Sequence, residues 1–177
     1  MTLNQDGNAT ALGASHLASN RGGVNRVTAS PRSFRVQPAE VQHLKPLARL
    51  HRAALPDTIN SHLGFGHLER VYRVMMMPFC KGMVSVALHD GEVVGGVSAS
   101  AVSNMLTSIV VDPEYRRMGI GRLLVNAVDD FFRAKRTGTY FVETRIANES
   151  AQAFYHRLGF TEIGRNRRDV TLRREVP

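Results

Sequence analysis

Short apolar runs of two different periods divide most of the chain into strands and helices. Alternating or continuously apolar runs predict strands at residues 34–37, 83–89, 92–99, 105–111, 139–145, 160–164 and 170–174. Apolar positions three and four residues apart predict helices at residues 38–54, 67–77, 119–135 and 149–158. This order predicts an α/β (α+β) fold, in which a central mixed sheet carries helices on both faces.

Three local signals refine this division. Pro46 lies inside the first helical pattern and should kink or shorten that helix. Asp90 and Gly91 separate two strand patterns and predict a tight hairpin turn. Residues 1–32 are rich in Ser, Asn, Gly, Ala and Thr, so we expect a disordered tail, although a start codon assigned too far upstream would look the same. Residues 33–177 are then expected to form one domain.

The most informative stretch joins the strand at 105–111 to the helix that follows it. An apolar strand runs through Pro113 into a basic loop with Gly119 and Gly121, and then into an amphipathic helix. Such a loop turns backbone N–H groups toward one point at the positive end of a helix dipole, which suits a diphosphate. Neither glycine has a Cβ atom to keep a phosphate away. Alternatively, the two glycines merely shape a strand-to-helix turn.

At these residues the chain resembles the GCN5-related N-acetyltransferase (GNAT) superfamily. Arg116, Gly119 and Gly121 match its acyl-CoA signature, Arg/Gln-x-x-Gly-x-Gly/Ala. A second match follows at residues 148–160, with Asn, Ala, Phe-Tyr and Gly-Phe in the family's order. The resemblance is sharp over residues 104–160 and general over 33–100. It implies an acyl-CoA N-acyltransferase fold, whose sheet is splayed between its fourth and fifth strands with acyl-CoA in the gap.

The resemblance also implies an activity and a set of contacts. It implies an N-acetyltransferase that moves an acetyl group from acetyl-CoA to an acceptor amine by direct attack in a ternary complex. A backbone N–H near Val110 or Val111 would polarise the thioester carbonyl, and the pantetheine arm would pair with the strand edge. Asn148 would touch that arm and also cap the following helix. The cofactor-binding residues predicted in this way are Ile109, Val110, Val111, Arg116, Arg117, Met118, Gly119, Ile120, Gly121, Arg122 and Asn148.

Tyr155 and Glu143 are the candidate catalytic residues. Tyr155 matches the position from which the family protonates the leaving thiolate, and a phenol with a pKa of about 10 suits that role; alternatively it packs beside its neighbours. Many family members carry a Glu base on the fourth strand, but residues 104–109 contain no carboxylate. Glu143 is therefore the candidate base, with His62 and His67 as alternatives, and a water chain could also remove the proton. The missing carboxylate leaves open a non-catalytic acyl-CoA-binding or sensor module.

The formal net charge of +8 has two interpretations. It can reflect a solubilising surface with phosphate contacts to an anionic cofactor, or a basic protein associated with nucleic acid. The sequence shows no zinc spacing, recognition helix or aromatic RNA-binding strand, so we favour the first. Arg165, Arg167 and Arg168 fall between the last two strands and favour an anionic acceptor, although a solvated turn explains them equally well. The expected partners are acetyl-CoA and an amine-bearing small molecule or peptide, and a homodimer stays open.

Location and metal content follow from simple patterns. The chain has no run of about 18 apolar residues and no secretory signal pattern, so we expect neither a membrane span nor export. The single cysteine, Cys80, cannot form an internal disulfide and permits a reducing compartment. We therefore expect a cytoplasmic protein. No His, Cys or Asp cluster has ligand spacing, so no metal is expected.

Overall fold

The computed structural model describes residues 33–54 and 65–177. The predicted tail at 1–32, and His62 with the segment 55–64, lie outside the described residues. The strands are β1 (Arg35–Pro38), β2 (Gly82–His89), β3 (Glu92–Ser100), β4 (Met105–Val111), β5 (Thr139–Arg145), β6 (Thr161–Arg165) and β7 (Asp169–Glu175). The helices are α1 (Val41–Ala54), α2 (Phe65–Met75), α3 (Ile120–Ala134) and α4 (Glu149–Arg157), with 3-10 turns η2 (Pro78–Cys80) and η3 (Pro113–Tyr115).

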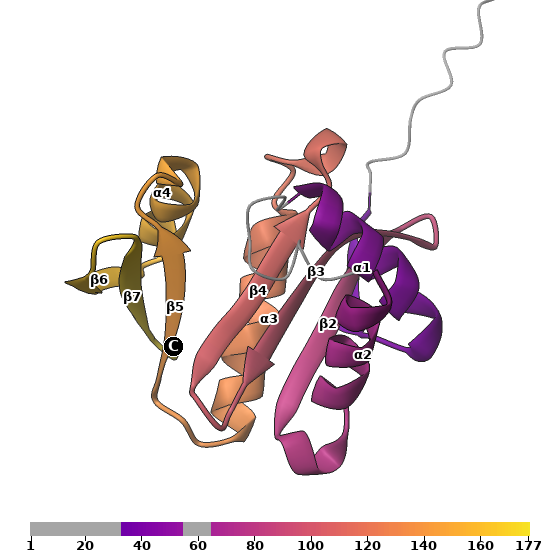
Figure 1. Cartoon of the computed structure of the whole chain (residues 1–177), viewed down its shortest axis with the longest axis horizontal. Helices are drawn as coiled ribbons and strands as arrows, with labels where there is room; N and C mark the ends of the chain where they lie inside the picture. The colour runs from indigo at the N-terminus through magenta and orange to yellow at the C-terminus, as the bar shows by residue number, and fades with distance from the viewer. Residues whose placement is uncertain (1–32, 55–64) are drawn as a thin grey trace, which may run out of the picture. The chain divides into compact units, whose positions relative to one another are not determined.

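The described strands form a mixed sheet in the order β1-β2-β3-β4-β5-β7-β6. Neighbouring strands are antiparallel except β4 and β5, which are parallel and joined at one pair, Met105 and Phe141. Figure 1 shows β5 turning away from β4 beyond this point. The predicted mixed sheet, splayed between its fourth and fifth strands, is confirmed.

Two adjacent glycines on β3 show that helices cover both faces of the sheet. A Cβ atom on Gly95 would lie 3.2 Å from Ile120 Cγ2 of α3, whereas one on Gly96 would lie 2.3 Å from Leu47 Cδ1 of α1. Successive strand residues point to opposite faces, so α1 and α3 lie on opposite sides of β3. A side chain at either position would therefore have to shift the facing Ile120 or Leu47 side chain, and Figure 1 shows α1 and α3 on the two sides of the sheet.

Pro46 does not end α1. The helix runs for 14 residues from Val41 to Ala54 with Pro46 inside it, so the expectation that Pro46 shortens the helix is wrong, while a kink at Pro46 stays a prediction. Leu44, Leu47 and Ala48 are almost fully buried on the face that packs against the sheet. Burial of these apolar side chains outweighs the single backbone hydrogen bond that a proline removes.

A buried ion pair attaches the outer strands to the rest of the sheet. The Asp129 carboxylate of α3 accepts hydrogen bonds from Arg174 Nε at 2.9 Å and Nη2 at 2.8 Å, and from the Tyr140 hydroxyl at 2.8 Å. Tyr140 also stacks on Phe132 of α3, with ring centroids 4.7 Å apart. β4 and β5 are joined at a single residue pair. The contacts of α3 with Tyr140 and Arg174 therefore hold β5 and β7 in place.

Within the described ranges, no helix is long and apolar enough to cross a membrane. The same residues contain no group of three or more His, Cys, Asp or Glu side chains arranged to hold a metal ion.

Candidate active site

The opening between β4 and β5 exposes one edge of β4. On its other side β4 pairs with β3 along its length, including Val111 with Gly95. Toward β5 the described part of the chain provides the Met105–Phe141 pair and a hydrogen bond from the Phe141 amide to the Asn104 carbonyl at 2.9 Å. The edge at residues 109–111, where pantetheine was predicted, therefore faces the opening without a strand partner among the described residues.

The loop after β4 brings free amides to the end of this opening. Asp112 accepts the Glu114 amide at 2.9 Å and so starts the turn. Gly119 then adopts φ +85° and precedes the first residue of α3. The Arg122 and Leu123 amides both donate to the Gly119 carbonyl, so the earlier amides of Ile120 and Gly121 belong to the first helical turn, which has no intrahelical acceptor. The first turn contains no acidic residue.

The two motif glycines differ in what surrounds them. A Cβ atom at Gly119 would have no atom within 4 Å, and its φ of +85° disfavours any side chain. This open space in front of free amides fits a phosphate group. At Gly121, by contrast, a Cβ atom would lie 2.8 Å from Cε2 of Phe154 on α4. The structure thus shows a different need for glycine at residue 121 from the one predicted. The missing side chain lets α4 approach α3 across the opening.

The predicted basic and capping residues surround the same loop. Arg116, Arg117 and Arg122 are exposed, and Arg116 Nε donates to the Val111 carbonyl at 3.4 Å. Asn148 accepts the Ala151 amide at 3.1 Å, which confirms it as the N-cap of α4. Its contact with a pantetheine arm stays a prediction. A rim of three cations at a helix N-terminus favours an anionic ligand.

Tyr155 is buried in α4 between the rings of Phe154 and Phe160, whose centroids lie 5.2 and 5.1 Å from its own. Burial raises the pKa of its hydroxyl above the ordinary value of 10, so the group stays protonated at neutral pH. The Tyr155 hydroxyl has no hydrogen-bond partner among the described residues. Every fully buried side-chain oxygen or nitrogen in the described residues does have a partner. Its oxygen is therefore not completely sealed from solvent, although the residue as a whole is buried.

Strand alternation places Glu143 on the opposite face from α4. Tyr140 and Val142 of β5 point into the core beneath α3, so Glu143, between Val142 and Thr144, points to the side that carries α1. Its side chain is exposed. Glu143 and Tyr155 accordingly belong to opposite faces of the sheet.

The sequence matches a family model for the acetyltransferase (GNAT) family over residues 49–160. The chain belongs to the GNAT family. It is 40% identical over 72 residues to the [Ribosomal protein bS18]-alanine N-acetyltransferase of Escherichia coli K12, which is 40% of this chain and 49% of the relative. It is 26% identical over 150 residues to an N-alpha-acetyltransferase of Sulfurisphaera tokodaii, covering 75% of this chain and 83% of the relative. The chain thus spans about half the length of the first of these curated relatives.

The fold of this GNAT chain is also found in solved structures. The PaiA N-acetyltransferase of Thermoplasma acidophilum, crystallised with coenzyme A, superposes with a TM-score of 0.68 at 16% identity, over 81% of this chain and 99% of that one. At this identity the likeness concerns the fold alone.

A polar cluster that the sequence analysis missed lies beside β4. His51 Nδ1 of α1 is 2.5 Å from the Tyr72 hydroxyl of α2 and 3.2 Å from the Ser108 hydroxyl of β4. Burial lowers the pKa of His51, and it raises the pKa of Tyr72 to about 12 against a smaller opposing effect of a hydrogen bond with Ser108. His67, one of the two histidines considered as an alternative base, is exposed on α2. One signal in the sequence was available: His51 continues the helical spacing of Leu44 and Leu47.

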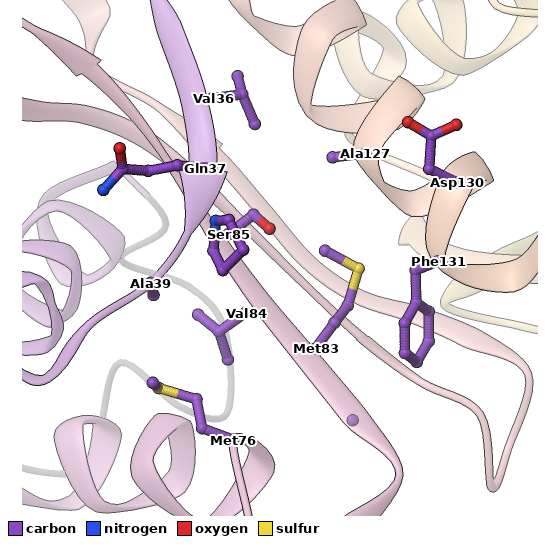
Figure 2. Close-up of a pocket in the computed structure, with 12 residues that line it drawn as sticks. Val36, Gln37, Ala39, Met76, Met83, Val84, Ser85, Ala127, Asp130 and Phe131 are labelled. Carbon is purple, nitrogen blue, oxygen red and sulfur yellow. The ribbon is translucent and has the colours of Figure 1, made fainter. Parts of the chain in front are cut away.

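Two hollows lie on the surface of this GNAT domain. The larger, about 570 Å³, is lined by residues of β1, β2 and α3 such as Val36, Met83 and Phe131, and it contains no predicted site residue (Figure 2). β1 and β2 form one edge of the sheet, two strands away from the opening between β4 and β5. The second, about 550 Å³, is lined by Arg145, Ile146, Ala147, Arg167 and Arg168, directly before Asn148. Three of its five lining residues are arginines, so this hollow is basic.

Proposed function

We propose that this GNAT protein is an acetyl-CoA-dependent N-acetyltransferase that acetylates the amine of an acceptor by direct attack in a ternary complex. The observation that carries the proposal is the opening between β4 and β5, which ends at free amides and the vacant space beside Gly119. Acetyl-CoA supplies the activated acetyl group when bound. Family membership supports the same activity.

The residues of the opening suit such a cosubstrate. The free edge at residues 109–111 can pair with the amides of a pantetheine arm, and the amides before Arg122 can hold the diphosphate. The exposed cations Arg116, Arg117 and Arg122 suit the remaining phosphates. Asn148 retains its side-chain NH2 group for the pantetheine arm, since its oxygen caps α4.

Tyr155 and the β4 backbone provide the acid chemistry in this proposal. Tyr155 holds its proton at neutral pH because burial raises its pKa, and it donates that proton to the leaving sulfur. A backbone N–H at Val110 or Val111 polarises the thioester carbonyl. Glu143 lies on the acceptor side of β5 and is one candidate for the base there, directly or through water.

The acceptor we propose is the α-amine of a polypeptide that begins with alanine. The Escherichia coli relative is named for an alanine acceptor, and the Sulfurisphaera relative is named an N-alpha-acetyltransferase. The basic hollow at Arg145, Arg167 and Arg168 favours an acidic residue farther along the peptide. Arg165 is engaged with Glu162 at 2.9 Å and is less available. The single Cys80 supports action in a reducing compartment, which we take to be the cytoplasm.

Two measurements test this function. Calorimetric titration with acetyl-CoA is expected to give saturable binding near one site per chain, and thiol release is then expected with short peptides that begin with alanine. Binding without thiol release from alanine peptides or small amines would instead favour a non-catalytic acyl-CoA sensor. Turnover with small amines but not with peptides would retain the enzyme and overturn the proposed acceptor.

A further inference from the structure

The cluster of His51, Tyr72 and Ser108 joins three elements that are far apart in the sequence. His51 and Tyr72 are 2% and 3% exposed, and their immediate environment is apolar, with Leu47, Leu68 and Val110 nearby in the same core cluster. Polar groups in such a core cost free energy unless they bond one another, and apolar residues would pack as well. A buried polar cluster that costs folding free energy and extends to the strand surface is a candidate for a functional role.

The end of this path faces the acceptor side of the opening. Val110 packs in the α1 cluster, and Ser108, two residues before it, points to the same face and bonds to His51. Ser108 is half-buried, whereas its two partners are buried. Ser108 follows Met105 on β4 by three residues, and Glu143 follows its partner Phe141 on β5 by two. Ser108 and Glu143 are therefore at similar heights on the two walls of the opening.

The hydrogen bonds allow a directed chain of donors. With His51 Nδ1 as acceptor, the Tyr72 O–H lies 2.5 Å and the Ser108 O–H 3.2 Å from the same nitrogen. The Ser108 oxygen can then give its proton to His51 as it receives one from the substrate. The chain starts at a hydroxyl that substrate can reach and ends at a neutral imidazole.

We propose that Ser108, Tyr72 and His51 form a proton relay that removes the proton from the attacking amine, a role that rests on the proposed acetyltransferase function. The new C–N bond forms as the thioester C–S bond breaks. The amine proton passes to Ser108 Oγ while the Ser108 proton moves to His51 Nδ1, and the Tyr72 hydroxyl holds the imidazole in position. Tyr155 gives its proton to the sulfur, and solvent then deprotonates His51 and reprotonates Tyr155. Ser108 is the catalytic residue, and Tyr72 and His51 are positioning residues.

The surroundings of His51 keep it ready as a proton acceptor. Burial lowers its pKa, so the imidazole is neutral at pH 7. Among the described residues, α2, β3 and β4 bring no carboxylate, lysine or arginine against the ring, and Tyr72 is the titratable group in contact with it. A neutral ring with one bonded hydroxyl can accept a proton transiently and return it.

The relay is tested with His51→Asn, Tyr72→Phe and Ser108→Ala, using acetyl-CoA and a hexapeptide that begins with alanine. We expect each variant to lower kcat about 10- to 100-fold and to leave the Kd for acetyl-CoA within about twofold. Ser98→Ala is the matched control, because Ser98 is the buried β3 neighbour of Ser108 in the sheet and its hydroxyl bonds to Thr107 at 2.8 Å instead of to His51 or Tyr72. It should retain the wild-type kcat.

The pH profile separates a relay from simple packing. In the wild type, log(kcat/KM) should fall with slope one below the pKa of the peptide amine and with slope two below the lowered pKa of His51. His51→Asn should remove the second break. In NMR spectra the His51 ring should titrate below 6.5, and Tyr72→Phe should move that titration.

Three results would overturn the relay. These are wild-type kcat in Ser108→Ala, retention of the second break in His51→Asn, and a kcat loss in Ser98→Ala as large as in Ser108→Ala. If the variants of the buried residues fail to fold, the kcat of Ser108→Ala, at a half-buried position, still tests the relay. A wild-type protein that binds acetyl-CoA and releases no thiol with any amine would instead remove the proposed function, and the relay with it.

Discussion

The Cβ position of Gly121 on α3 lies 2.8 Å from Cε2 and 2.9 Å from Cζ of the Phe154 ring on α4. The second glycine of the Arg-x-x-Gly-x-Gly motif therefore lets two helices from opposite sides of the sheet opening touch. Gly119, the first glycine, faces open space. One short motif thus combines a residue that faces open space with a packing residue, and the two can be separated by substitution.

Gly121→Ala is expected to destabilise the protein by about 1–3 kcal/mol, because the added methyl group must displace the Phe154 ring. Phe154→Leu in the same chain should recover part of this loss, which a double-mutant cycle of urea unfolding would measure. Gly66→Ala, in α2 with nothing within 4 Å, is the helical control and should be neutral or stabilising. Additive effects of Gly121→Ala and Phe154→Leu would contradict the contact.

Gly119→Ala is expected to weaken acetyl-CoA binding about tenfold or more, since 1.4 kcal/mol of lost contact accounts for a factor of about ten. The left-handed backbone should also cost about 1–2 kcal/mol of stability. Gly91→Ala is the matched control, because its φ of +84° and its open surroundings are the same but it lies in the β2–β3 turn. Equal losses of affinity in both variants, measured by calorimetry, would refute a ligand-facing role for Gly119.

Tyr155→Phe is expected to reduce kcat about 10- to 100-fold while the Kd for acetyl-CoA and the stability stay near wild type. The hydroxyl has no partner among the described residues, so its removal leaves the packing intact. Tyr140→Phe should instead lower the stability and leave kcat near wild type, since the Tyr140 hydroxyl bonds to Asp129 at 2.8 Å. Thiol release and urea unfolding of both variants check this. An unchanged kcat in Tyr155→Phe would leave Tyr155 as a packing residue.

Asp129→Ala is expected to cost about 3–5 kcal/mol of stability, because it leaves the Arg174 guanidinium without its partner. The two side chains of this ion pair are 14% and 4% exposed, for Arg174 and Asp129 respectively. Asp130→Ala on the same helix removes an exposed pair with Arg133 and should cost no more than about 1 kcal/mol. Similar urea midpoints for the two variants would show that the buried pair does not hold β7 to α3.

Stability is expected to fall as pH drops below about 6.5, the ordinary pKa of a histidine. Burial lowers the pKa of His51 in the folded state, so the unfolded chain takes up a proton that the folded chain refuses. The loss begins near the unfolded pKa and stops growing below the folded one. His51→Gln should remove this component of urea unfolding measured between about pH 7.5 and 5, whereas His67→Gln, at an exposed position, should retain it. An unchanged pH dependence in His51→Gln would count against the buried neutral imidazole.

The elements themselves were predictable because their signals are local. The strand at Met105–Val111 and the N-cap at Asn148 depend on neighbours within a few residues, and both have the predicted positions. The basic glycine loop also follows from adjacent residues, and its resemblance to the GNAT family agrees with the family match. Pro46 shows the limit of such signals, because its local cost is outweighed by burial against a distant sheet.

The sequence by itself therefore determined the order of elements, the family and the position of the basic glycine loop. Only the tertiary structure decided what Gly121 touches, which face Glu143 occupies, and that His51 meets Tyr72 and Ser108. Periodicity shows that a residue is buried, but it does not show which distant residue shares that burial. Those partners depend on the strand register and on how closely helices approach the sheet, and both are set by packing across the whole domain.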